Sequence, residues 1–278
     1  MQKPPFVQKT SLNNSWRKTA VAIFEKPVDG KLSGFWDFDM IEVSKALKEW
    51  NGQGNRVTIM HFFMAVMSRV LAYHVPELNA YCQWGSVKQR DDVTVSATVS
   101  IGGQEISMVK IEQAHLKSIL DISKETNDVV KQRREGRDDK ALSRRDPLAQ
   151  IPWPFRTWLF RFMRWFVYEW GGSIPGSGFS KDMFGSTLVT NIGSIGLHYG
   201  VPALQPASNL SAVFAIGRIH DSVKVIDGEM QVRSIMPLSV TFDHRIVDGA
   251  HVGRILEAAL YYFAHPEALL DTTPPSKD

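Results

Sequence analysis

The fold is decided by Ser234-Ile-Met-Pro-Leu-Ser-Val-Thr-Phe-Asp-His-Arg-Ile-Val-Asp-Gly-Ala-His-Val-Gly-Arg254, a stretch that predicts a buried strand leading directly into a helix. Residues 236–242 are mostly apolar and β-branched, with small polar side chains between, a pattern typical of a largely buried strand. Asp248 then occupies the position of a helix N-cap, and apolar residues recur after it at helical spacing. His244 therefore lies where a strand ends and a helix is about to begin.

His244 and Asp248 are the candidates for chemistry in this stretch. A histidine with a pKa near ~6.5 can take up and return a proton at neutral pH. A carboxylate four residues further on can cap the helix, orient the loop or pair with an arginine. Spacing alone leaves a plain structural interpretation open, in which Asp248 only caps a helix and His244 only bonds to nearby backbone.

Composition excludes several other classes of protein. The 278 residues are 44% hydrophobic and 22% charged, which is ordinary for a globular chain with a sizeable core. A net charge of +3 is too small to predict nucleic-acid binding. The single cysteine, Cys82, excludes an internal disulfide, and the scattered histidines predict no metal site. The first residues lack the apolar core of a signal peptide, so we expect a cytoplasmic protein.

Alternation and helical spacing predict the remaining elements. Ser44 and Thr58 stand where helix N-caps are expected. The predicted strands cover residues 33–41, 93–101, 105–111, 187–192, 212–219 and 222–226, and the predicted helices cover 44–50, 58–71 and 116–133.

The string Asp243-His-Arg-Ile-Val-Asp-Gly249 resembles the Asp-His-Arg-x-x-Asp-Gly signature of the dihydrolipoyl acyltransferase catalytic domain, the core subunit of 2-oxoacid dehydrogenase complexes. Three weaker likenesses occur earlier in the chain, in the same order as in the family, at Arg17, at residues 76–80 and at 185–196. The whole resemblance spans about residues 16–270. That family shares its fold with chloramphenicol acetyltransferase. The resemblance implies an α/β protein of two layers, with helices packed on a mixed central sheet.

The same resemblance implies a mechanism and a set of site residues. His244 would be the general base that deprotonates coenzyme A, the co-substrate, or the acceptor. Thr190 stands where the family has a serine, and its hydroxyl would stabilise the oxyanion. Asp248 would hold the loop, with Arg17 as its structural partner. In the family the active sites lie between the subunits of a homotrimer, and no metal takes part.

We expect an N-terminal arm over residues 1–15 and one catalytic domain over 16–278, interrupted by an insertion at 143–183. A predicted helix within the insertion contains aromatic residues and three arginines that fall within an arc of roughly 140°. Those arginines exclude a simple transmembrane span. Residues 153–170 could contact a membrane peripherally, cover the acceptor end of the active site, or only add core. Either of the first two roles suggests a lipid-like or bulky apolar acceptor.

Three functions therefore remain open from the sequence. The first is an acyltransferase that moves an acyl group between a coenzyme A thioester and an acceptor of its own. The second is the core subunit of a 2-oxoacid dehydrogenase complex, working with a lipoyl domain supplied in trans, since no covalent lipoyl group is expected on this chain. The third is a non-catalytic, membrane-associated scaffold of the same fold.

Overall fold

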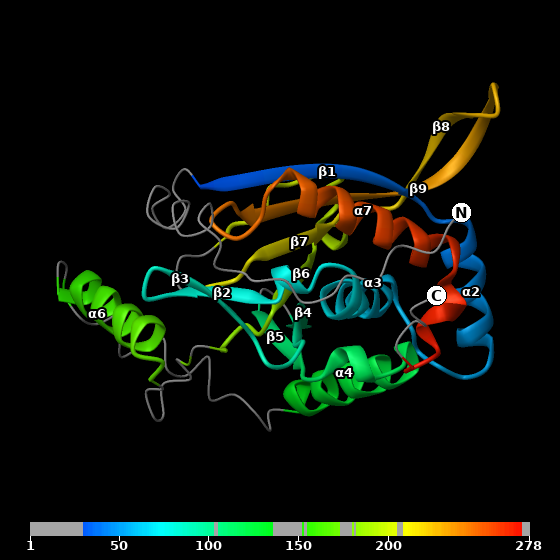
Figure 1. The fold of residues 1–278 in the computed structure, drawn as a ribbon. Coiled ribbons are helices and arrows are strands. Elements are labelled where there is room, and N and C mark those ends of the chain that lie inside the picture. Colours follow the sequence, from blue (N-terminus) through cyan, green and yellow to red (C-terminus); the bar gives the residue numbers. More distant parts are fainter. Residues whose placement is uncertain are drawn as a thin grey trace.

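A seven-stranded mixed sheet forms the centre of the fold (Figure 1). The computed structural model describes residues 30–102, 105–135, 152, 155–172, 180, 182–204 and 208–273. The strands follow the order β1-β9-β7-β6-β4-β5, and β8 pairs with the N-terminal part of β9. Strand pairs β4/β6 and β6/β7 are parallel and the others are antiparallel, which confirms the predicted α/β fold with a mixed central sheet.

The elements have the following bounds. The strands are β1 (Lys31–Asp39), β2 (Ala80–Gln83), β3 (Ser86–Gln89), β4 (Val95–Gly102), β5 (Glu105–Ile111), β6 (Thr187–Asn191), β7 (Ala212–Ile216), β8 (His220–Ile226) and β9 (Glu229–Asp243). The α-helices are α2 (Ile41–Gly52), α3 (Ile59–Arg69), α4 (Ile119–Arg134), α6 (Phe155–Glu169) and α7 (Gly249–Ala264). Short helical turns are η1 (Val70–His74), η2 (Pro76–Leu78), η3 (Ala114–Leu116), η4 (Gly193–Ile195) and η5 (Pro266–Leu269).

Strand β9 confirms the buried strand predicted before His244, and it is longer than predicted. Its C-terminal part pairs with β1 on one side and β7 on the other, so every residue from 235 to 243 is buried. Its N-terminal part pairs only with β8, and this hairpin projects from the body of the protein (Figure 1). The strand therefore anchors its C-terminal end, and the residues after it, in the middle of the sheet.

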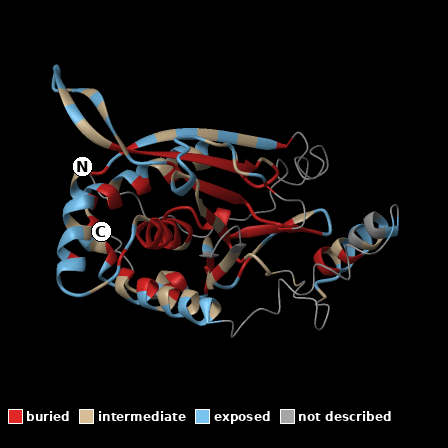
Figure 2. Cartoon of the chain, turned by 180° about the vertical axis from the view of Figure 1, so that it is seen from behind, coloured by how far each residue is buried: buried red, intermediate tan, exposed pale blue. Residues whose placement is uncertain are grey.

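The main core lies between one face of the sheet and the helices. Helix α3 is mostly apolar and is buried around its whole circumference, and Figure 2 shows it as a buried helix surrounded by other elements. It packs against the sheet and against α4 and α7, whose outer faces are exposed. This arrangement explains why most residues of α3 are hydrophobic, whereas the other helices have one apolar side.

Most predicted elements are confirmed, with errors at helix starts. Thr58 caps α3 as predicted, but Ser44 is not a cap. Helix α2 begins at Ile41, because the Asp39 carboxylate accepts a hydrogen bond from the Ile41 N–H at 2.9 Å. Helix α4 begins at Ile119, after a separate helical turn, rather than at residue 116. The β2–β3 hairpin was not predicted.

His61 gives the fold a pH dependence that can be measured. Burial lowers its pKa to about 4, and its ring Nδ1 accepts a hydrogen bond from the Thr58 N–H at 3.1 Å. The unfolded chain, with a histidine pKa near 6.5, takes up a proton that the folded chain does not. The stability conferred by neutral His61 is therefore complete above about pH 6.5 and falls as the pH decreases toward 4.

We predict that His61→Gln removes this dependence and keeps the cap, because glutamine commonly occupies this position of a capping box. Urea unfolding at pH 7 and pH 4.5 measures the effect. Between the two, the original chain should lose roughly 2–3 kcal/mol more unfolding free energy than the variant. Equal losses would show that His61 is not the titrating group.

Candidate active site

His244 follows the last residue of β9, where the backbone and the ring are both fixed. Its N–H donates to the carbonyl of Gly30 at 2.8 Å, beside the start of β1. Its ring Nδ1 lies 2.7 Å from the carbonyl oxygen of Val247. Because a carbonyl only accepts, Nδ1 must carry the proton, and the basic lone pair of the neutral ring is on Nε2. This is the tautomer that a general base acting through Nε2 requires.

The residues directly before and after His244 form a buried ion pair. The Arg245 guanidinium contacts both carboxylate oxygens of Asp243, with Nε–Oδ1 at 2.9 Å and Nη2–Oδ2 at 2.5 Å, and both side chains are buried. Burial alone would lower the pKa of Arg245, but the hydrogen-bonded Asp243 carboxylate and nearby charges raise it. The Asp243 N–H also donates to the carbonyl of Ser211 at 2.9 Å. These contacts hold the residues on either side of His244 in one arrangement.

Asp248 is the N-cap of α7. Its backbone is extended, and its carboxylate accepts a hydrogen bond from the His251 N–H at 3.4 Å. The Asp248 N–H in turn donates to His251 Nδ1 at 3.2 Å, which completes a capping box. The capping role predicted from the sequence is therefore confirmed in the geometry. Arg17, its predicted partner, lies outside the described residues.

Thr190 lies in β6, two strands away from β9. Its hydroxyl accepts a hydrogen bond from Thr98 Oγ1 at 2.7 Å, on the sheet face opposite the neighbouring core residue Val189. Thr190 aligns with Ala215 of β7, which aligns with the β9 residue five positions before His244. Two strand spacings and five residue rises separate the Thr190 and His244 backbones by roughly 19 Å. One chain therefore does not bring the two predicted site residues together.

The loop after Thr190 has the shape that its glycines predict. Gly196 has a φ of +88°, and a Cβ at Gly193 would meet the Gly217 backbone at 2.7 Å. Large apolar side chains of this loop point outward, with Ile195 74% and Leu197 48% exposed. The strand that carries Thr190 therefore ends in a tight turn with an exposed apolar surface.

Several residues of the site were not singled out from the sequence. Thr98 is 92 positions from its partner Thr190, so only the pairing of β4 with β6 reveals the contact. The Val247 carbonyl, which fixes the His244 tautomer, has no side-chain signal. Glu169, at the C-terminal end of α6, contributes through its charge to raising the pKa of Arg245.

Charged residues elsewhere do not suggest a second centre. Within the described ranges, no group of three or more His, Cys, Asp and Glu side chains could hold a metal ion. A hollow of about 780 Å³ is lined by charged residues but by neither His244 nor Thr190. Six of its eight charged side chains form ion pairs, such as Lys117 with Glu125 at 2.6 Å, and we assign it no ligand.

The sequence matches the model of one protein family, the 2-oxoacid dehydrogenases acyltransferase (catalytic domain), over residues 11–141 and 178–270. The chain belongs to this family. A dihydrolipoyllysine-residue acetyltransferase component of the Bacillus subtilis acetoin cleaving system is 27% identical over 78% of this chain and 44% of its own length. The chain spans less than half the length of this and another curated relative, from Mycoplasma capricolum. The enzyme class predicted from the sequence, an acyltransferase, is confirmed at the level of the family.

Solved structures share the fold. The cubic core of a pyruvate dehydrogenase multienzyme complex superposes with a TM-score of 0.63 at 15% identity, covering 95% of this chain and 94% of that one. A chloramphenicol acetyltransferase gives 0.56 at 13% identity, covering 92% and 99%. Azotobacter vinelandii dihydrolipoamide acetyltransferase gives 0.62 at 16% identity, covering 91% and 88%; its catalytic mechanism was investigated through a serine, a histidine and an asparagine four positions after the histidine. The predicted chloramphenicol acetyltransferase-like fold is therefore confirmed.

The Asp243–Arg245 pair gives a prediction about the loop that carries His244. Asp243→Leu leaves the buried Arg245 charge without its partner and should lower the free energy of unfolding by about 3–5 kcal/mol. The double variant Asp243→Leu/Arg245→Met removes both charges and should recover a large part of that loss. Denaturant unfolding measures both, and a double variant as unstable as the single one would contradict the pairing.

Proposed function

We propose that this chain transfers an acyl group between a coenzyme A thioester and an acceptor, with His244 as general base. The hydrogen bond from His244 Nδ1 to the Val247 carbonyl carries the proposal. It holds the proton on Nδ1 and directs the basic character of the ring to Nε2. A histidine with only a structural role would not need the residues before and after it to be held in place by a buried ion pair.

In the proposed reaction, Nε2 of His244 removes the proton from the attacking thiol or hydroxyl. The resulting sulfur or oxygen anion attacks the thioester carbonyl carbon, and the carbonyl oxygen becomes an oxyanion. The tetrahedral intermediate then collapses. The thiolate of the original thioester leaves and takes the proton back from His244. In one direction coenzyme A is the attacking thiol, and in the other it is the leaving group.

Thr190 is the proposed donor to the oxyanion. Because Thr98 donates to the Thr190 oxygen, the Thr190 O–H can point to another acceptor. Loss of one such donor typically costs about 3 kcal/mol of transition-state stabilisation. The methyl group that threonine adds to serine stands beside this hydroxyl and narrows the space for the acyl group.

The separation of Thr190 from His244 supports a site between two copies of the chain. At roughly 19 Å, the hydroxyl of one chain cannot reach an oxyanion formed beside its own histidine. We propose a homotrimer in which His244 of one subunit faces Thr190 of the next. The exposed Ile195 and Leu197 would be covered by the neighbouring subunit.

Asp248 is proposed as a positioning residue, because it caps α7 four residues after His244. The asparagine investigated in the Azotobacter vinelandii enzyme stands at the same spacing from its histidine. We propose that Asp248 holds the His244 loop, with Arg17 as its partner, and takes no proton during the reaction.

The acceptor is proposed to be lipid-like or bulky and apolar. The charge of Glu169, at the C-terminal end of α6, contributes to raising the pKa of Arg245 in the His244 loop. Large exposed aromatic side chains at that end would shape a pocket for an apolar molecule.

A second candidate acceptor is a dihydrolipoyl group supplied by another chain. The names of the curated relatives favour it, because they are dihydrolipoyllysine-residue acetyltransferases. Transfer to dihydrolipoamide, compared with transfer to long-chain alkyl thiols and alcohols, distinguishes the two acceptors. A chain that transferred to neither would support the scaffold function instead.

We predict that His244→Ala lowers kcat for acyl transfer at least about a hundredfold, because general-base catalysis is lost. The assay uses the acyl-CoA species that mass spectrometry identifies bound to the purified protein. His265→Ala, at the other end of α7, is the matched control and should keep full activity. A His244 variant that retained more than about a tenth of the rate would remove it from the role of base.

A further inference from the structure

Helix α6 and the β2–β3 hairpin lie at the end of the protein opposite the β8–β9 hairpin (Figure 1), and they carry six exposed aromatic side chains. Each is between 38% and 61% exposed. We call this surface the aromatic ridge, and it consists of Trp84, Trp158, Phe162, Trp165, Phe166 and Trp170. Five of the six belong to α6 or directly follow it, within residues 142–177, which the family model does not match. The family's shared catalytic domain therefore does not account for it.

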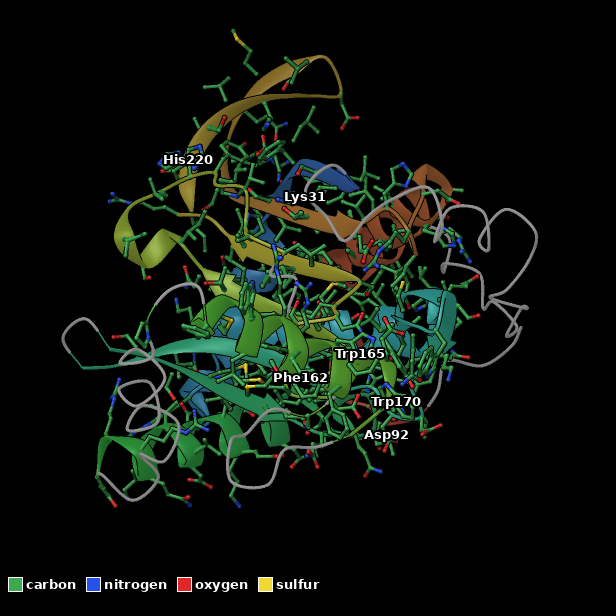
Figure 3. The ribbon with its side chains drawn as sticks, turned by 90° about the vertical axis from the view of Figure 1, so that its left-hand side faces the viewer. Lys31, Asp92, Phe162, Trp165, Trp170 and His220 are labelled. Atoms are coloured by element: carbon green, nitrogen blue, oxygen red, sulfur yellow. The ribbon has the colours of Figure 1, made fainter. Side chains whose placement is uncertain are left out.

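Five of the six ridge residues, all but Trp158, form one continuous chain of ring contacts. Ring centroids lie 5.5 Å apart for Trp84 and Trp170, 5.9 Å apart for Trp165 and Trp170, and 5.9 Å apart for Phe162 and Trp165. Figure 3 shows the labels of Phe162, Trp165 and Trp170 close together on the side that faces the viewer, away from His220. At 100° per residue, the four ridge residues within α6 fall inside an arc of about 100°. One side of the helix is therefore an aromatic face.

The opposite side of α6 attaches the helix to the protein. Met163, Val167 and Tyr168 are buried there, and Gln83 of β2 donates to the Glu169 carbonyl at 3.0 Å. Arg161 is exposed and lies about 40° around the helix from Trp165, at the edge of the aromatic face. The aromatic side chains thus point outward while part of the predicted arginine arc faces the protein. A helix that served only to add core would have the reverse orientation.

Trp84 provides an independent observation. It occupies the two-residue turn between β2 and β3 with a φ of 50°, a left-handed conformation that is unfavourable for a bulky side chain. Asparagine or glycine would fit that turn without strain. Its indole is nevertheless 55% exposed, so burial within the chain does not offset the cost. The turn presents a tryptophan outward, next to Trp170.

We propose that the aromatic ridge docks on the interfacial layer of a lipid bilayer with anionic headgroups. Tryptophan is enriched at that depth, and a helix with one aromatic face and arginines at its edges lies in the plane of the interface. The sequence of α6 carries three arginines and one glutamate, and the Glu169 carboxylate accepts the Trp84 N–H at 2.6 Å. The resulting positive charge complements anionic lipid.

The shape of the surface favours lipid over a protein partner. Helix α6 stands out from the sheet as a projection, whereas a protein partner would need a groove matched to it (Figure 1). Within the described residues no helix is long and apolar enough to cross a membrane, so the contact is peripheral. This docking does not depend on the acyl transfer proposed above.

The test compares two triple variants in vesicle flotation. The ridge variant is Trp158→Ser/Phe162→Ser/Trp165→Ser. The control is Val225→Ser/Met230→Ser/Val232→Ser, which removes three even more exposed apolar side chains from the β8–β9 hairpin. Vesicles contain phosphatidylcholine alone or with phosphatidylglycerol. The original chain and the control should float with the anionic vesicles, and the ridge variant should bind them more than about tenfold more weakly.

Contact depth is measured in the same samples. Lipid with brominated acyl chains should quench the tryptophan fluorescence of the original chain, because quenching requires the indoles to reach those chains. Arg161→Glu leaves the apolar surface intact and should abolish the preference for anionic vesicles. This single variant tests the proposal even if the triple variant misfolds. Equal flotation of the ridge variant and the original chain would overturn the proposal. The proposal would also be overturned if the original chain did not bind vesicles and only the ridge variant changed its oligomeric mass.

Discussion

The hydrogen bonding of β9 on both sides is the constraint from which the rest of the structure follows. Its C-terminal part is enclosed by β1 and β7, so residues 235–243 have no freedom to shift in register. His244 emerges from this fixed strand end, and the Asp243–Arg245 ion pair sets the direction of the chain as it leaves. The position of the proposed base is thus determined by the sheet rather than by the loop.

The sequence predicted this part of the fold because each local signal agreed with the global structure. A continuous apolar run, an N-cap at Asp248 and helical spacing after it gave the strand, the loop and α7 in their observed places. Predictions were wrong where a short contact overrode propensity. Asp39 begins α2 earlier than Ser44 would, and the β2–β3 hairpin was missed although Gly85 stands beside Trp84 in its turn.

The candidate site was predictable in its residues and only partly in its geometry. His244 and Thr190 came from motifs, but their separation depends on strand order, which composition and spacing do not encode. The contact between Thr98 and Thr190 likewise follows from the parallel pairing of β4 with β6. For α6, spacing predicted a helix with an aromatic side but not which side faces water. That depends on where Gln83 and the buried Tyr168 attach it.

The central claim is that one chain's His244 works with another chain's Thr190, and subunit complementation tests it most directly. Chains carrying His244→Ala and chains carrying Thr190→Val would be expressed separately and then together, with different tags to isolate mixed assemblies. Each variant alone should be nearly inactive. In a mixed trimer of either composition one of the three sites pairs an intact histidine with an intact threonine, so about a third of the original activity should return in the isolated mixed assemblies. Mixed assemblies that remained as inactive as the single variants would contradict the account.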